Sequence, residues 1–237
     1  MSKSRVRNHA LYFLGVASYV VSLIPFVKVD ALRALVLVPI IAYTLPVMEY
    51  VQPRAMSLKL GYKDIVLIIP ALLPYVFMKP NIYILLPASL LVLTFLLYFT
   101  KLTMWGNVVG TAFEASLSMV WGTFVNNPLF LTPSLYWLLY VFNGAVYVEY
   151  KIPFRKLDKR VVQVSWLISL PLMLFIGMRA PLLFLTLVEP TIRYLKPGEK
   201  LKSPKEIKEL GRKGSKKDMA FLAILAISYF VSVSLLR

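Results

Sequence analysis

The sequence predicts an all-α fold, a polytopic membrane bundle of about nine transmembrane helices. Of its 237 residues, 59% are hydrophobic and only 16% are charged, whereas a soluble domain carries about 25% charged residues. Apolar runs close to membrane-spanning length recur along the whole chain, so the apolar excess belongs to many spans rather than to one core. Lysine and arginine gather in every second segment between those runs, which is the pattern of cytoplasmic loops.

The apolar runs define nine expected spans. Their approximate ranges are 9–27, 31–48, 64–79, 82–100, 104–125, 132–149, 161–178, 180–195 and 219–236. The runs at 64–79 and 180–195 are the weakest, because a helix needs about 20 residues to cross without help. Prolines fall inside several spans, and neighbouring helices of a bundle can satisfy the backbone groups that proline frees. The first span follows Lys3, Arg5 and Arg7 without a clear cleavage site, and we expect it to be retained.

The loop charges predict the orientation. With the N-terminus in the cytoplasm and strict alternation, the outside segments hold few of the 27 lysines and arginines. These few are Lys28, Arg33, Lys79, Arg179 and Arg237. If the number of spans were wrong, every loop after the mistake would be assigned to the wrong side, and the inside and outside charges would be mixed. We therefore expect a multi-pass protein of the cell membrane with its N-terminus in the cytoplasm and its C-terminus outside.

Composition also excludes several classes of function. The net charge of +16 would suggest nucleic-acid binding in a soluble protein, but here the cations lie between apolar runs and no nucleic-acid motif accompanies them. The chain has no cysteine and a single histidine, His9. Iron–sulfur clusters, thiol catalysis and bis-histidine haem ligation within one chain are therefore excluded.

The longest inside segment is the basic loop 196–218, which precedes the expected last helix at 219–236. It alternates lysine with glutamate, so part of it suits an amphipathic helix at the membrane surface. Ser203 followed by Pro204 fits an N-cap with proline at the first helical position. Anionic lipid headgroups are its expected partner, and a solvated connector is the equally good alternative.

Glu114 is the clearest ionisable residue inside a span, where charge is costly. Asn107, Gly110, Thr111, Ser118 and Gly122 surround it at helical spacing, forming a stripe of small and polar residues. Such a stripe faces other helices or a wet cavity rather than lipid. Two readings stay open: a buried Glu that ties helices together, or a residue of a binding pocket.

A second inward stripe is expected on the sixth span. Its residues are Tyr136, Tyr140, Asn143, Tyr147 and Lys151. An aromatic wall with a cation at its cytoplasmic end suits a lipid-like ligand whose anionic head lies at the interface. The alternative is an interfacial tyrosine belt, which does not explain Asn143.

The pattern E-Y-x-x-P followed by Arg occurs twice. It reads Glu49-Tyr50-Val51-Gln52-Pro53-Arg54 and Glu149-Tyr150-Lys151-Ile152-Pro153-Phe154-Arg155. Both copies lie at the cytoplasmic ends of spans, four spans apart. This indicates two related four-helix halves, 9–100 and 104–195, in a parallel repeat. Alone, either glutamate is best explained by pairing with a nearby Arg or Lys.

These features resemble the UbiA-type intramembrane prenyltransferase superfamily, whose functional loops follow helices two and six. The segment Gly144-Ala145-Val146-Tyr147-Val148 before a basic loop and Gly110-Thr111-Ala112-Phe113-Glu114 resemble its YwiC-like branch. The resemblance implies a site for an isoprenoid or quinone-like lipid. It places Glu49 and Glu149 at the acidic, catalytic and metal-binding positions. It also implies Arg54 and Arg155 as phosphate contacts. Independently of the resemblance, the cationic loops could bind an anionic head directly through Arg54, Lys63, Lys151 and Arg155, and the stripe on the sixth span adds Asn143 and Tyr147 to the expected ligand site. Because no D-x-x-x-D motif is present, the two glutamates offer at most one weakly held Mg²⁺.

Three functions follow as expectations. The first is a prenyltransferase-like protein that acts on or binds a lipid with an anionic head at the cytoplasmic face. The second is a non-catalytic membrane subunit or anchor of a larger complex. The absence of redox ligands is compatible with an anchor but not with a carrier of bis-histidine haem. The third is a transporter with Glu114 as its proton or cation site.

Overall fold

The computed structural model describes residues 9–79 and 81–235, which form helices joined by short loops, with no β-strand among them. The predicted all-α fold is confirmed. The α-helices are α1 (His9–Leu23), α2 (Ala31–Met56), α3 (Tyr62–Leu72), α4 (Leu85–Phe99), α5 (Thr103–Phe124), α6 (Leu131–Lys151), α7 (Lys159–Gly177), α8 (Val188–Leu195) and α9 (Pro204–Leu235). Three 3₁₀ segments accompany them, η1 (Leu73–Phe77), η2 (Ile82–Ile84) and η3 (Pro181–Leu187). The N-terminal cations Lys3, Arg5 and Arg7, and residues 236 and 237, lie outside the described residues.

Each of the two shortest expected spans, 64–79 and 180–195, combines an α-helix with a 3₁₀ segment, as the start of the span 82–100 also does, where η2 leads into α4. Helix α3 passes into η1, and η3 leads into α8. A proline stands in the first turn of η1 and of η3, Pro74 in the former and Pro181 in the latter. Because proline has no N–H group to donate, Pro74 interrupts the α-helical hydrogen-bond pattern where α3 passes into η1, whereas Pro181 stands at the first position of η3, where no such bond is needed.

Four helical segments in the described part of the chain are long and apolar enough to cross a membrane. They are Ala31–Met56, Ile82–Phe99, Lys159–Gly177 and Glu209–Leu235, with mean hydropathies from 1.6 to 2.3. At most 28% of each apolar window is buried in the bundle, so large side chains such as Val92 and Phe175 face outward. Extensive outward apolar surface is expected where lipid is the solvent. These helices indicate a membrane protein. The count of nine spans and the orientation remain predictions.

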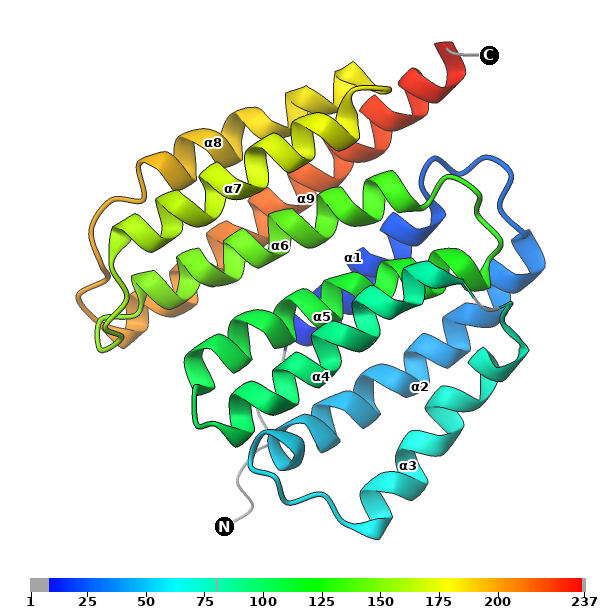
Figure 1. The fold of residues 1–237 in the computed structure, drawn as a ribbon, viewed down its shortest axis with the longest axis horizontal. Coiled ribbons are helices and arrows are strands. Elements are labelled where there is room, and N and C mark those ends of the chain that lie inside the picture. The colour runs from blue at the N-terminus through cyan, green and yellow to red at the C-terminus, as the bar shows by residue number, and fades with distance from the viewer. Residues whose placement is uncertain (1–8, 80, 236–237) are drawn as a thin grey trace.

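The helices form two groups that α1 and α5 join (Figure 1). Helices α6, α7, α8 and α9 lie together, while α2, α3 and α4 form the second group. Helix α5 packs against α4, α6 and α1, and α1 also contacts α6. The repeat in the sequence assigns α5 to the second half, whereas in space it is the central helix between the two groups.

Polar side chains lock the central helices to one another. The indole Nε1 of Trp137 on α6 donates to Ser18 Oγ on α1 over 3.0 Å. Ser18 Oγ in turn donates to the backbone oxygen of Glu114 on α5 over 3.3 Å. Trp137 and Ser18 are completely buried. Because a buried polar group without a partner is costly, these bonds favour one register of α1, α5 and α6.

The last helix begins fifteen residues earlier than expected. Residues 204–218, expected as part of a basic loop, form the first half of the continuous helix α9. Its start at Pro204, after Ser203, agrees with the N-cap pattern in the sequence. Tertiary contacts account for the extension: Tyr140 Oη donates to Asp218 Oδ1 over 2.7 Å, which holds this half of α9 against α6. A lysine-rich composition alone does not reveal such a contact.

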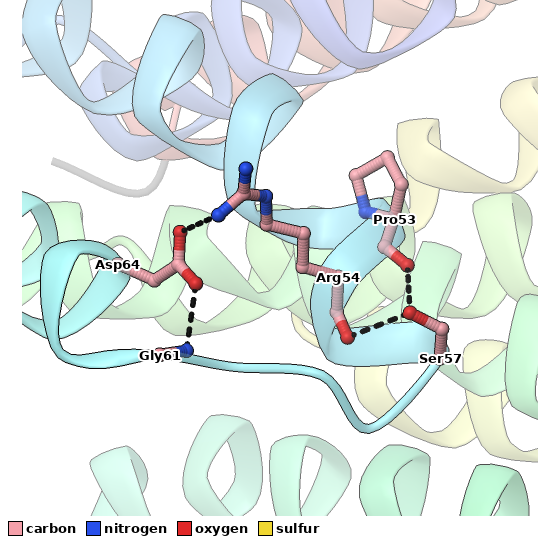
Figure 2. A network of polar contacts seen from close by, with 5 residues as sticks. All are labelled: Pro53, Arg54, Ser57, Gly61 and Asp64. Carbon is pink, nitrogen blue, oxygen red and sulfur yellow. Dashed lines mark hydrogen bonds and ion pairs between the residues drawn. The ribbon is translucent and has the colours of Figure 1, made fainter.

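A polar network joins the end of α2 to the start of α3 (Figure 2). Arg54 Nη1 lies 2.9 Å from Asp64 Oδ1, and the backbone N–H of Gly61 donates to Asp64 Oδ2 over 2.8 Å. Asp64 is fully buried in the first turn of α3. Ser57 Oγ donates to the backbone oxygens of Pro53 and Arg54 and closes the end of α2. The network thus fixes the turn between the two helices.

Replacing Asp64 with alanine removes both of its bonds at the start of α3. We expect the free energy of unfolding to fall by about 1–2 kcal/mol, the cost of losing a helix cap and a buried hydrogen bond. Thermal unfolding of the purified protein in one detergent measures the change. Lys63→Ala, at the exposed neighbouring position, is the matched control. Equal melting temperatures for Asp64→Ala and the unmodified protein would contradict this role.

Candidate functional site

A chamber of about 550 Å³ lies between α1, α2, α5, α6, α8 and α9. One part of its lining is apolar. This part includes Leu11, Phe13 and Leu14 of α1, Val108 of α5, and Val141, Ala145 and Val148 of α6. The other part is polar and charged. It includes Gln52, Asn107, Glu114, Tyr140, Tyr147, Glu149, Arg193, Lys213, Lys217 and Asp218. The chamber therefore suits an amphipathic molecule.

Two carboxylates and two amides form the acidic wall of the chamber, which consists of Gln52, Asn107, Glu114 and Glu149. Gln52 Nε2 on α2 donates to Glu114 Oε1 on α5 over 3.1 Å. Asn107 Nδ2 on α5 donates to Glu149 Oε1 on α6 over 3.1 Å. Each amide thus bridges two helices and supplies a donor to a carboxylate that is only 7% exposed. Of the two readings for Glu114, the structure supports both, because this residue ties helices and also lines the chamber.

Glu149 also pairs with the arginine of its own motif. Arg155 Nε lies 2.9 Å from Glu149 Oε2, an ion pair whose N–H is not aligned for a hydrogen bond. Helix α6 continues regularly to Lys151, so Glu149 keeps its helical direction toward α5. Asn143 turns to α7 instead, where its Nδ2 donates to Ser169 Oγ over 2.8 Å. Glu149 and Asn143 therefore have separate surroundings.

The first copy of the motif has a different local structure. Helix α2 runs through Pro53 and ends at Met56, whereas α6 ends before Pro153. Glu49 accepts a hydrogen bond from Tyr12 Oη on α1 over 2.9 Å, and Arg54 is bound to Asp64. Neither Glu49 nor Arg54 lines the chamber. Within the first copy, Gln52 is the residue that lines the chamber. It occupies one of the two x positions of E-Y-x-x-P, which the pattern does not specify.

The basic wall of the chamber comprises Arg193 of α8 with Lys213 and Lys217 of α9. Arg193 Nη2 donates to Tyr140 Oη over 2.9 Å and lies 3.2 Å from Glu189 Oε2. Its guanidinium carbon lies 4.7 Å from the ring centre of Tyr194 and 5.4 Å from that of Tyr140. Aromatic faces stabilise a cation in this position. No local sequence pattern distinguishes these three cations from the other lysines and arginines near the expected inside segments.

The expected stripe on α6 divides between two faces. Tyr140 and Tyr147 line the chamber. Tyr136 and Asn143 face α7 instead. Tyr136 Oη donates to the backbone oxygen of Met173 on α7 over 2.6 Å, and Asn143 donates to Ser169 on the same helix. Lys151 Nζ donates to the backbone oxygen of Glu199 and holds the loop that leads to α9. Lys63 is exposed, with its Nζ 5.9 Å from the ring centre of Tyr62, and lines neither cavity.

A second, smaller cavity of about 250 Å³ lies between α2, α4 and α5. It shares four residues with the chamber: Gln52, Asn107, Thr111 and Glu114. Of the small and polar stripe expected around Glu114, Gly110 also lines this cavity, while Gly122 packs against Phe130. Glu114 and three stripe residues, Asn107, Gly110 and Thr111, thus line a cavity. Ser118 and Gly122 are buried in the packing of the bundle instead.

The carboxylates do not meet the needs of a metal-bound diphosphate. Among the described residues, no three His, Cys, Asp or Glu side chains gather at one point. Glu49 is bonded to Tyr12, and Glu149 to Asn107 and Arg155. The two glutamates share no cavity wall. Mg²⁺ ions that bridge a diphosphate need several carboxylate oxygens directed at one place, so we derive no reaction step through a metal.

Comparisons with family models, with curated proteins and with solved structures find no match to this chain.

The pairing of Glu149 with Arg155 predicts energetic coupling between them. In a double-mutant cycle of Glu149→Gln and Arg155→Gln, we expect a coupling of about 1–2 kcal/mol. This lies above the ~0.2–1 kcal/mol of exposed pairs, because the Glu149 side chain is only 9% exposed. Unfolding in detergent provides the four stabilities. The exposed pair Glu209–Lys213 is the matched control and should show clearly weaker coupling. Additive effects at Glu149 and Arg155 would contradict the prediction.

Proposed function

We propose that this protein binds an amphipathic lipid in the chamber. Its apolar chain lies along Leu14, Val141 and Val148, and its anionic group faces Arg193, Lys213 and Lys217. The observation that carries the proposal is the lining itself, which places an apolar surface and three cations around one cavity. Most ligand sites combine an apolar wall with a few placed polar groups.

The geometry favours α8 and α9 as the source of the anion contacts. Arg54 and Arg155, the phosphate contacts implied by the resemblance, are each engaged with a carboxylate, Asp64 and Glu149. Lys213 and Lys217 pair with Glu209 and Glu189 while their side chains are 68% and 47% exposed. Exposed ion pairs contribute only about 0–1 kcal/mol. A lipid phosphate can therefore replace the glutamates at little cost.

Binding rather than prenyl transfer is what the chamber supports best. The isoprenoid or quinone-like ligand suggested by the resemblance fits the apolar part of the lining as one member of a wider class of lipids. Transfer from a diphosphate would require the clustered carboxylates that Glu49 and Glu149 do not provide. The proposed activity is therefore recognition of a lipid head, with no covalent step.

We further propose that the end of the bundle with the basic wall faces the cytoplasm. The chain has no cysteine, so one introduced thiol reports its own side of the membrane. In intact cells, an impermeant maleimide should react with Lys79→Cys but not with Lys156→Cys. Lys156→Cys should react only after the cells are opened. Both positions are exposed in the structure. Labelling of both from the same side would contradict the alternating topology.

Filling the chamber should prevent lipid binding without harming the fold. Gly214 of α9 lines the chamber, and a Cβ atom placed there meets nothing within 4 Å. In Gly214→Leu the larger side chain projects into the chamber beside Lys213 and Lys217, where the lipid head is proposed to lie, and we expect about tenfold less lipid retained, equivalent to ~1.4 kcal/mol. Native mass spectrometry of protein released from lipid nanodiscs measures the retained lipid.

Gly214→Ala is the matched control for this experiment, because it gives the same gain in helix propensity without filling the chamber. Both variants should unfold at or above the temperature of the unmodified protein. Equal lipid retention by Gly214→Leu and Gly214→Ala would overturn the assignment of the chamber as the binding site.

A further inference from the structure

We propose that Glu114 binds the primary ammonium group of a zwitterionic lipid head, of the phosphoethanolamine type. This inference rests on the proposed function and specifies the class of ligand that the chamber takes. It assigns the phosphate to the basic wall formed by Arg193, Lys213 and Lys217, and the ammonium to the acidic wall that contains Glu114.

Glu114 has an oxygen for which the described part of the chain supplies no partner. Its Oε1 accepts from Gln52 Nε2 over 3.1 Å, and its Oε2 has no hydrogen bond among residues 9–79 and 81–235. No lysine or arginine in those ranges forms an ion pair with it. The residue is 7% exposed and lines both the chamber and the smaller cavity. A nearly buried carboxylate thus faces cavity space with one of its two oxygens left unbonded by the described residues.

A carboxylate at membrane depth is costly unless a donor or a cation compensates it. The other carboxylate of the acidic wall already has such compensation, because Glu149 lies beside Arg155 and Asn107. At Glu114 only the neutral amide of Gln52 contributes. A cationic group on the ligand would supply the missing charge.

The neighbours of Glu114 select the kind of cation. Each amide of this wall already gives one N–H to a carboxylate, since Gln52 donates to Glu114 and Asn107 donates to Glu149. Acceptor capacity is left over. Asn107 Oδ1 accepts one bond, from Tyr98 Oη, and the hydroxyl of Thr111 donates to the backbone oxygen of Asn107 and keeps its lone pairs. A primary ammonium has three donors and no acceptor, so it matches a wall that offers acceptors.

The two walls together define the head. A singly anionic head would satisfy the basic wall and leave Glu114 without a cation. A quaternary ammonium would supply the charge but has no N–H group to donate. A phosphate joined to a primary ammonium satisfies both walls, because it carries both charges and three N–H donors.

Competition among lipids tests this assignment. The full-length protein is placed in nanodiscs with equal amounts of phosphatidylethanolamine, phosphatidylcholine and phosphatidylglycerol of identical acyl chains. Native mass spectrometry then reports which lipid stays bound. We expect at least about tenfold preference for phosphatidylethanolamine over each of the other two, the ratio that ~1.4 kcal/mol provides.

Glu114→Gln should abolish that preference, because an amide of the same shape has no negative charge. Thr111→Val, which removes an acceptor and preserves side-chain shape, should weaken the preference several-fold. Glu199→Gln is the matched control, since it removes one negative charge from a loop residue that does not line the chamber. It should leave the preference unchanged.

Two results would overturn the assignment of Glu114. One is equal retention of the three lipids by the unmodified protein. The other is a preference that persists in Glu114→Gln. Either result leaves lipid binding in the chamber intact, provided that Gly214→Leu still lowers retention. If the unmodified protein retains no lipid at all, the proposed function itself fails, and the role of Glu114 fails with it.

Discussion

A carboxylate buried among apolar helices must be hydrogen-bonded, and much of this fold follows from how that requirement is met. Glu114 and Glu149 each receive a bond from an amide on a different helix, Gln52 on α2 and Asn107 on α5. These two bonds connect α2, α5 and α6 at the wall of the chamber. A similar rule holds at α3, where the buried Asp64 is paired with Arg54 and with the N–H of Gly61. Polar contacts of this kind specify which apolar helices meet, because apolar surfaces alone discriminate little in lipid.

The repeated motif shows how similar sequences can acquire different roles. In both copies an arginine is bound to a carboxylate, but Arg54 holds the turn to α3 while Arg155 holds Glu149 at the chamber. Pro53 stays within α2, and Pro153 follows the end of α6. The first copy contributes Gln52 to the acidic wall of the chamber, and the second copy contributes Glu149. The two copies thus contribute to one cavity with different residues.

The chamber gains its charge from a segment that looks like a connector in the sequence. The first half of α9 is rich in lysine, and it becomes part of the bundle because Asp218 is bonded to Tyr140 on α6. Arg193 is held in place by the same tyrosine. The positive-inside rule explains Arg193, Lys213 and Lys217 only as charges of a cytoplasmic loop. In the structure they line one wall of a cavity. Two of these cations, Lys213 and Lys217, form ion pairs with the exposed carboxylates Glu209 and Glu189, and such pairs contribute little to stability.

Hydrophobic periodicity, proline positions and capping residues determined the helices. The all-α class, the approximate helix ranges and the start of α9 at Pro204 follow from such local patterns, because each depends on residues close together in the chain. That Glu114 and Glu149 need polar partners could also be predicted, since carboxylates are rare within or beside apolar spans. Only the tertiary structure decided their partners. Gln52 is 62 residues from Glu114, and Asn107 is 42 residues from Glu149. Long-range pairs of this kind depend on how the helices pack, and no local pattern in the sequence encodes that arrangement.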